Sequence, residues 1–256
     1  VYLACISRVL TFASTAALAF VASALGALFA ASAAKQPARH EGAAADASAP
    51  PAAHYPMMTR SQYLLLPVSA ACSWLVTQGI STYTLFSSTF LGFSQANIGS
   101  LFSMGALVGV ATQLLLLPRL SARLGERLCC SLGCASMGLC FGLCALLRRQ
   151  PAHALLYLLY RAGLALADTT TSALIVKASE TPASRARNLA LSQSVQAGTR
   201  IFSPVLSFYL YERSLTFSRA PGALPFVLAG SLALAASTLP LFLPLQRPPK
   251  PTAKAG

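Results

Sequence analysis

Charged residues are scarce in this 256-residue chain, at 10% of the total. Acidic residues are the scarcest, because 6 Asp and Glu stand against 19 Lys and Arg, and the chain has 3 histidines. Hydrophobic residues make up 55% of the sequence, and the mean hydropathy is +0.61. A soluble fold of this composition would leave too much apolar surface in contact with water. The lack of charge therefore predicts a protein whose solvent is lipid.

Apolar stretches long enough to cross a bilayer occupy most of the sequence. A hydrocarbon core of about 30 Å needs about 20 apolar residues per helix. We therefore predict an all-α, polytopic membrane bundle with seven transmembrane helices. The stretches lie near residues 10–33, 63–91, 96–118, 128–147, 153–176, 189–211 and 222–245. The first is predicted to be a true span, because its apolar run is longer than that of a typical signal peptide.

The excess of positive charge describes topology and gives no indication of nucleic-acid binding. Lys and Arg cluster at the ends of the predicted spans, where basic residues favour the cytoplasmic side. Twelve fall on one side of the membrane and five on the other. This distribution predicts a C-terminus in the cytoplasm and an N-terminus outside or in a lumen, and it does not identify the membrane.

The predicted organisation is one helix (1–34), a flexible cytoplasmic linker (35–60), a six-helix transmembrane bundle (61–246) and a cytoplasmic tail (247–256). The linker is rich in Ala and Pro and poor in large apolar side chains, so it cannot bury a core. The chain starts at Val1, close to an apolar stretch, which suggests a fragment of a longer protein.

Groups suited to catalysis are nearly absent from the predicted spans. All three histidines are placed outside the spans, and Asp168 is the one carboxylate within the spans. We therefore expect no enzyme activity, no cofactor and no metal ligand set based on histidine. Five cysteines crowd the span at 128–147 and are interpreted as small packing residues, with a metal or redox site as the alternative: Cys129, Cys130, Cys134, Cys140 and Cys144.

Three charged residues fall within the predicted spans: Arg161, Asp168 and Arg200. Ionisable groups in the hydrocarbon region are costly and usually face a bundle interior or a water-filled pathway, with a partner. Asp168 and Arg200 are predicted at comparable depth on successive helices, and we expect them to be in contact. This pair is either a structural salt bridge or a proton-coupling site centred on Asp168. Arg161 is then an unpaired positive charge, suited to an anionic substrate.

Polar and amphipathic residues elsewhere in the spans have two interpretations. They line a substrate cavity, or they form hydrogen bonds between helices. The candidates are Trp74, Gln78, Tyr83, Gln113 and Gln193. Glycines repeat at four-residue spacing in two spans, at Gly105 and Gly109 and at Gly138 and Gly142, and this spacing predicts close helix packing.

The segment 118–127, PRLSARLGER, resembles the G-x-L-x-D-R-x-G-R-R cytoplasmic loop of the major facilitator superfamily. Pro118, Ala122 and Glu126 depart from that pattern. The matching positions are Leu120, Arg123, Gly125 and Arg127.

The segment 185–211 resembles the eleventh helix of drug and tetracycline antiporter-like members of that superfamily. This resemblance implies that the chain is the C-terminal half of such a transporter, helices six to twelve. It also implies proton-coupled antiport or export of small organic solutes. The implied partners are the lipid bilayer, the solute, protons, and a missing N-terminal half or a second protomer. The matching positions are Arg187, Ser192, Gln193, Ser194, Gly198, Arg200, Pro204 and Tyr211.

Two other function classes fit seven spans. A G-protein-coupled type of receptor is disfavoured, because no D/E-R-Y follows the third span and no N-P-x-x-Y occurs in the seventh. A membrane scaffold that does not transport remains open.

Overall fold

The computed structural model describes residues 60–179, 181–217 and 220–243. The predicted helix at 10–33, the linker up to residue 59 and the tail at 247–256 lie outside these residues. The described part is helical and contains no strand, as predicted. Its elements are α2 (Arg60–Tyr63), α3 (Leu65–Leu91), α4 (Gln95–Ala111), the π-helix η1 (Thr112–Leu116), α5 (Leu117–Cys144), α6 (Gln150–Lys177), α7 (Pro182–Leu215), α8 (Leu224–Ala236) and the 3₁₀-helix η2 (Leu239–Phe242).

Local sequence sets the ends of these helices. The Ser94 side chain accepts a hydrogen bond from the Asn97 N–H and caps α4. At the start of α7, Thr181 and Ser184 exchange side-chain and backbone hydrogen bonds in a capping box. This cap explains why α7 begins at Pro182, ahead of the predicted start at residue 189.

The predicted loop at 118–127 is largely helical, and the chain reverses at one residue. Helical structure continues from α4 through η1 into α5, with Gly125 as the non-helical position. Gly125 has φ 78° and ψ 158°, a conformation that side-chain-bearing residues rarely adopt. The glycine of the loop pattern therefore makes the turn between two helical segments.

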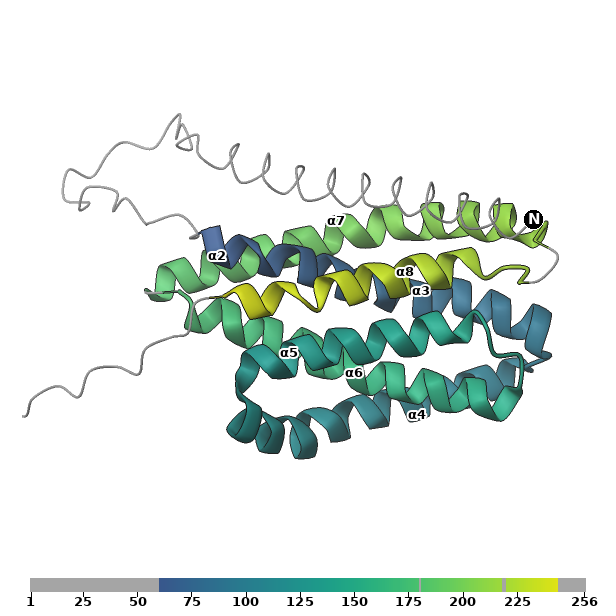
Figure 1. The fold of residues 1–256 in the computed structure, drawn as a ribbon, viewed down its shortest axis with the longest axis horizontal. Coiled ribbons are helices and arrows are strands. Elements are labelled where there is room, and N and C mark those ends of the chain that lie inside the picture. Colours follow the sequence, from purple (N-terminus) through teal and green to yellow (C-terminus); the bar gives the residue numbers. More distant parts are fainter. Residues whose placement is uncertain (1–59, 180, 218–219, 244–256) are drawn as a thin grey trace, which may run out of the picture.

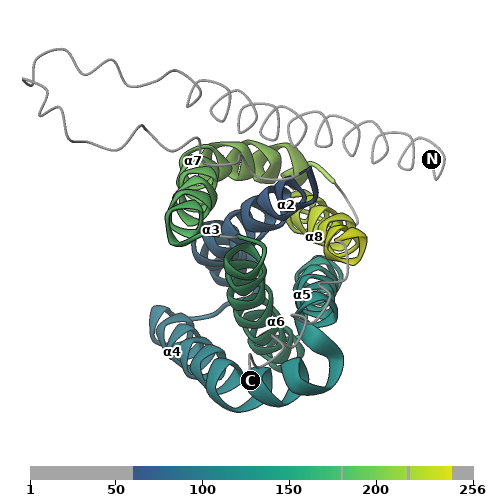
Figure 2. The same cartoon turned by 90° about the vertical axis from the view of Figure 1, so that its left-hand side faces the viewer.

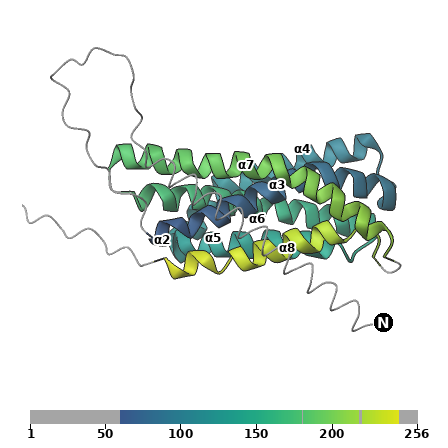
Figure 3. The same ribbon diagram turned by 90° about the horizontal axis from the view of Figure 1, so that it is seen from above.

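The long helices lie side by side along one axis of the molecule (Figures 1 and 3). Seen end on, α6 lies between α4 and α5, and α3 lies beside α7 (Figure 2). α3 and α7 run parallel, as do α4 and α6, whereas α5 runs antiparallel to α6 and α8. The most extensive packing joins α5 to α6.

Glycines allow α5 to approach two neighbours at backbone distance. A Cβ atom on Gly133 would lie 2.7 Å from the backbone nitrogen of Ala167 on α6. One on Gly138 would lie 2.8 Å from the carbonyl oxygen of Gly230 on α8. The close packing predicted for Gly138 is confirmed, and Gly133 was not singled out by spacing.

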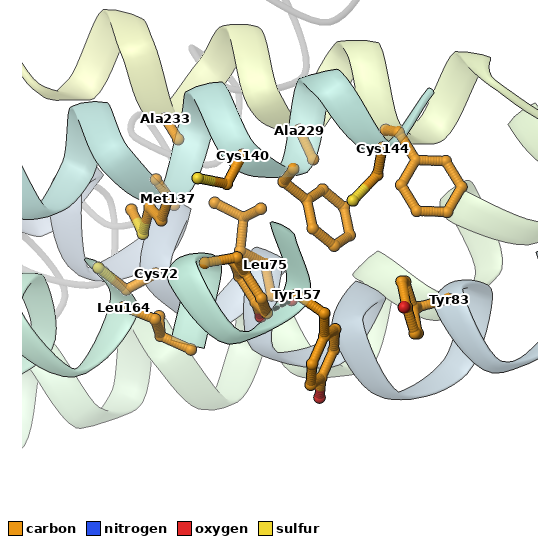
Figure 4. Close-up of a cluster of buried hydrophobic side chains, with 14 of the residues drawn as sticks. Cys72, Leu75, Tyr83, Met137, Cys140, Cys144, Tyr157, Leu164, Ala229 and Ala233 are labelled. Atoms are coloured by element: carbon orange, nitrogen blue, oxygen red, sulfur yellow. Dashed lines mark hydrogen bonds between the residues drawn. The ribbon is translucent and has the colours of Figure 1, made fainter. Parts of the chain in front are cut away.

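The core between α3, α5, α6 and α8 combines aromatic rings with thiols (Figure 4). Phe141 lies 5.0 Å from the ring centroids of both Tyr160 and Phe226. The five clustered cysteines of α5 are buried free thiols, and all except Cys129 pack among these side chains. Their position supports the packing interpretation.

His153 corrects the prediction that every histidine lies outside the buried region. Its side chain is fully buried in the first turns of α6. One ring nitrogen lies 2.9 Å from the Cys144 carbonyl oxygen, and the other lies 3.3 Å from the Tyr83 hydroxyl. The imidazole can be buried because both nitrogens have partners.

Arg148 ties together the connections at the same end of the bundle. Its guanidinium carbon lies 4.7 Å and 5.0 Å from the ring centroids of Phe86 and Phe90, and Nη2 donates to the Pro221 carbonyl oxygen at 3.0 Å. Burial lowers the pKa of Arg148, and the nearby Tyr211 opposes that shift. The α5–α6 connection is thereby fixed to the end of α3 and to the connection before α8.

Large apolar side chains cover much of the outer surface. Leu107 and Leu114 of the α4–η1 segment are 70% and 69% exposed, and Phe202 and Val205 of α7 are both 73% exposed. By length and apolar composition alone, two stretches within the described residues qualify as membrane spans, residues 95–144 and 224–242. The prediction of seven spans is therefore not confirmed. Serine and threonine in α3, and charged residues in α6 and α7, make these helices more polar.

Candidate functional site

The three charged residues predicted inside the spans lie on two helices. α6 carries Arg161 and Asp168, both half-buried, and α7 carries Arg200, which is exposed. Arg161 and Asp168 are seven positions apart in the sequence, which places them on one face of α6, two turns apart.

Hydrogen bonds to α3 and within α7 hold Arg200 in place. Its Nε donates to Ser73 Oγ at 3.0 Å, and its Nη2 donates to Gln196 Oε1 at 3.4 Å. Ser73 Oγ in turn donates to the Gln196 carbonyl oxygen at 3.0 Å. One turn earlier, the hydroxyls of Ser69 and Ser192 are 2.8 Å apart. These bonds fix the guanidinium at the α3–α7 contact.

Asp168 and Arg200 do not form an ion pair with each other. Arg200 acts on the Asp168 carboxylate electrostatically, but the ion pair found among the described residues joins Lys177 to Glu126. The predicted contact between Asp168 and Arg200 is thus corrected, because Ser73 and Gln196 take the guanidinium donors. No hydrogen bond to the Asp168 carboxylate occurs within the described ranges.

Arg161 is positioned by the packing of α6 against α4. Its Cγ would lie 3.0 Å from a Cβ atom on Gly105, so its aliphatic stem runs directly over that glycine. Its Nε is buried and has no hydrogen-bond acceptor. The guanidinium interacts with the Tyr160 hydroxyl, which donates its own proton to the Leu75 carbonyl oxygen at 2.7 Å. No carboxylate pairs with Arg161 in the part of the chain that the structure describes.

Gln78 links three helices and is fully buried. Its amide oxygen accepts hydrogen bonds from Trp74 Nε1 at 2.9 Å and from Ser207 Oγ at 2.6 Å, and its Nε2 donates to the Pro225 carbonyl oxygen at 3.0 Å. Every polar atom of the amide faces a protein group. Of the two interpretations given for Gln78 and Trp74, this arrangement supports hydrogen bonding between helices.

The other two glutamines differ from each other. Gln113 Nε2 donates to Thr169 Oγ1 at 2.9 Å and joins η1 to α6. Gln193 is exposed on α7, which leaves it accessible to a solute or to another protein surface.

The loop-pattern residues lie at the opposite end of the bundle from Arg148. Arg127 Nε donates to the Pro240 carbonyl oxygen at 3.2 Å, and its Nη2 donates to the Leu241 carbonyl oxygen. Glu126, a departure from the pattern, forms the ion pair with Lys177 at 2.6 Å. Leu120 is half-buried and Arg123 is exposed. The turn therefore connects α5 to the end of α6 and to η2.

Sequence reasoning missed Ser73 and Gln196. It singled out Gly105 for close helix packing but did not predict its contact with Arg161. A usable signal was present, because Ser69 and Ser73, and likewise Ser192, Gln196 and Arg200, are spaced four residues apart. Such spacing predicts one polar face on each helix.

Comparison with known proteins places the chain in one family. The family model described as Major Facilitator Superfamily matches residues 6–204. Neither the curated proteins nor the solved structures gave a match.

Proposed function

Because this chain belongs to the major facilitator superfamily, it is an integral membrane protein and a transporter of that superfamily, and we propose that it exchanges or exports small organic solutes in a proton-coupled manner. We further propose that it forms the C-terminal part of a drug and tetracycline antiporter-like carrier, with seven transmembrane helices. The family assignment favours a carrier over a receptor.

Asp168 is the proposed proton-binding group. Its carboxylate is half-buried and has no hydrogen bond or ion pair among the described residues, while Arg200 acts on it from nearby. This is the observation that carries the proposal. Since a neighbouring cation and burial act in opposite directions on a carboxylate, a change in the Arg200–Ser73–Gln196 arrangement would change the proton affinity of Asp168. Solute binding and proton binding would thereby be coupled.

Arg161 is the proposed binding group for an anionic solute. A buried donor without an acceptor costs about 1–3 kcal/mol, and the buried Nε of Arg161 is such a donor. A guanidinium recognises carboxylates and phosphates through two parallel hydrogen bonds. A solute carrying one of these groups would give Arg161 its missing acceptor.

Substrate exchange in this class of transporter takes place between two helical halves. We therefore propose that the bundle pairs with an N-terminal half or with a second protomer. The distribution of Lys and Arg supports a cytoplasmic C-terminus.

Proton coupling can be tested on the purified chain by measuring protons bound or released when a solute binds. We would titrate radiolabelled lactate, succinate and benzoate into weakly buffered protein that contains a pH-sensitive dye. The wild type is expected to exchange up to about one proton per solute bound, since one carboxylate is involved. Asp168→Asn should bind solute without proton exchange, whereas Glu212→Gln, at an exposed carboxylate of α7, should behave as the wild type. Unchanged proton exchange in Asp168→Asn would refute the assignment.

A further inference from the structure

α4 and α6 pack in a regular register that brings Arg161 against a glycine. Gly105 faces Arg161, Gly109 faces Ala165, and Gln113 bonds to Thr169, so each pair is separated by 56 residues. The register repeats every four residues, so successive turns of the α4–η1 segment meet successive turns of α6.

The two glycine contacts in this register differ in closeness. A Cβ atom at Gly105 would lie 3.0 Å from Arg161 Cγ and 3.6 Å from its Cδ. A Cβ atom at Gly109 would lie 3.8 Å from the Ala165 Cβ, which is ordinary van der Waals contact. Gly105 is therefore the position at which α4 limits the path of the Arg161 side chain.

Tyr157 cannot easily yield to a larger residue at position 105. Its Cε1 would also lie 3.0 Å from a Cβ there. Its ring stacks on Phe102 with centroids 5.5 Å apart and an interplanar angle of 18°, and it packs 4.6 Å from Tyr83 and 5.6 Å from Tyr160. Figure 4 shows the Tyr157 ring projecting from α6 away from the α5 side chains. Displacement would therefore fall on the flexible stem of Arg161.

We propose that Gly105 is a positioning residue that holds the Arg161 guanidinium where it can receive the carboxylate or phosphate group of a solute. This inference rests on the proposed anion-binding role of Arg161. Without a side chain at position 105, the stem lies against the α4 backbone and the guanidinium is held beside the Tyr160 hydroxyl. An alanine there would move the guanidinium and weaken the site for anions while sparing neutral solutes.

Chemical modification tests the positioning step without any substrate. Purified wild type, Gly105→Ala and Gly109→Ala would be treated with phenylglyoxal, which reacts with guanidinium groups, and Arg161 would be followed by peptide mass spectrometry. We expect the Arg161 modification rate to change about threefold or more in Gly105→Ala and to stay unchanged in Gly109→Ala. Equal rates in all three proteins would overturn the inference.

A double-mutant cycle tests the link to solute binding. Binding of radiolabelled benzoate, lactate and succinate would be compared with binding of neutral benzamide. Gly105→Ala is expected to weaken carboxylate binding about tenfold, and the same change in an Arg161→Ala background should have no further effect.

The outcomes separate the inference from the proposed function. If no carboxylate binds the wild type, or if Arg161→Ala leaves carboxylate binding unchanged, the proposed anion role fails, and the assignment of Gly105 to anion recognition fails with it. If Arg161→Ala weakens binding but Gly105→Ala acts equally in both backgrounds, only the positioning role is overturned.

Discussion

Replacing Gln78 with leucine should destabilise the bundle more than any other glutamine substitution in the described helices. The change removes three hydrogen bonds, from Trp74 and Ser207 and to the Pro225 carbonyl oxygen. The Trp74 indole N–H on α3, the Ser207 hydroxyl on α7 and the Pro225 carbonyl oxygen on α8 then lose Gln78 as their partner. The leucine side chain has nearly the same volume, so the effect comes from polarity rather than from a cavity.

The expected magnitude follows from measurements on hydrogen bonds between membrane helices. These average about 0.6 kcal/mol each and reach about 1.7 kcal/mol, and the Gln78 bonds lie at a fully buried position. Three bonds therefore give a loss of about 2–5 kcal/mol. In a protein of this size, that corresponds to a fall in Tm of about 4–20 °C.

The assay is thermal unfolding of the purified chain in detergent, followed by intrinsic fluorescence. Gln113→Leu is the matched control, because it removes one hydrogen bond at an exposed position and should cost less than about 1 kcal/mol. Carboxylate binding is the second measurement. Equal stability of the two variants would refute the structural role of Gln78. Loss of binding in Gln78→Leu without loss of stability would refute that role and would show that Gln78 contacts solute.

Further predictions concern the turn at Gly125, the contacts of Arg148 at the other end of the bundle, and the α5–α6 contact at Gly163. Gly125→Ala should cost about 1–3 kcal/mol by thermal unfolding because of its positive φ, whereas Gly99→Ala, on an open helical surface, should be neutral or stabilising. Arg148→Gln should cost about 1–3 kcal/mol through lost cation–π and hydrogen-bond contacts, a result contradicted if Tm does not fall. Gly163→Ala should cost about 1–3 kcal/mol, because its Cβ would lie 2.8 Å from the Met137 nitrogen; an unchanged unfolding midpoint would contradict this packing.

Hydrophobic runs predicted the helices of the core better than their ends. α3 and α6 lie within a few residues of the predicted spans at 63–91 and 153–176. The start of α7 was missed because Arg185 and Arg187 interrupt the apolar run, although a capping box begins the helix before them. Apolarity reports burial in lipid, whereas capping and backbone hydrogen bonding set helix ends.

The sequence predicted which charged residues make up the candidate site, but it did not predict their hydrogen-bond partners. The sequence placed Asp168 and Arg200 at similar depth, and in the structure Arg200 acts on the Asp168 carboxylate electrostatically without forming an ion pair. The sequence could not show that Ser73 and Gln196 would accept hydrogen bonds from Arg200, because these bonds depend on the rotation of α7 against α3. His153 was misplaced for a similar reason, since its burial depends on partners from the end of α5 and from α3.

The difference between Arg200 and Arg161 has a functional consequence. Arg200 has protein acceptors on α3 and α7, so a movement of these helices relative to each other would change its position. Arg161 has a stem packed at Gly105 and a buried donor without an acceptor among the described residues, so its proposed role in solute binding does not depend on the α3–α7 contact. A solute at Arg161 and a proton at Asp168 would then share one face of α6, two turns apart. In the proposed mechanism, movement of α7 would alter the field at Asp168 while leaving the Arg161 site intact, so that solute recognition and proton release would be separated within one bundle.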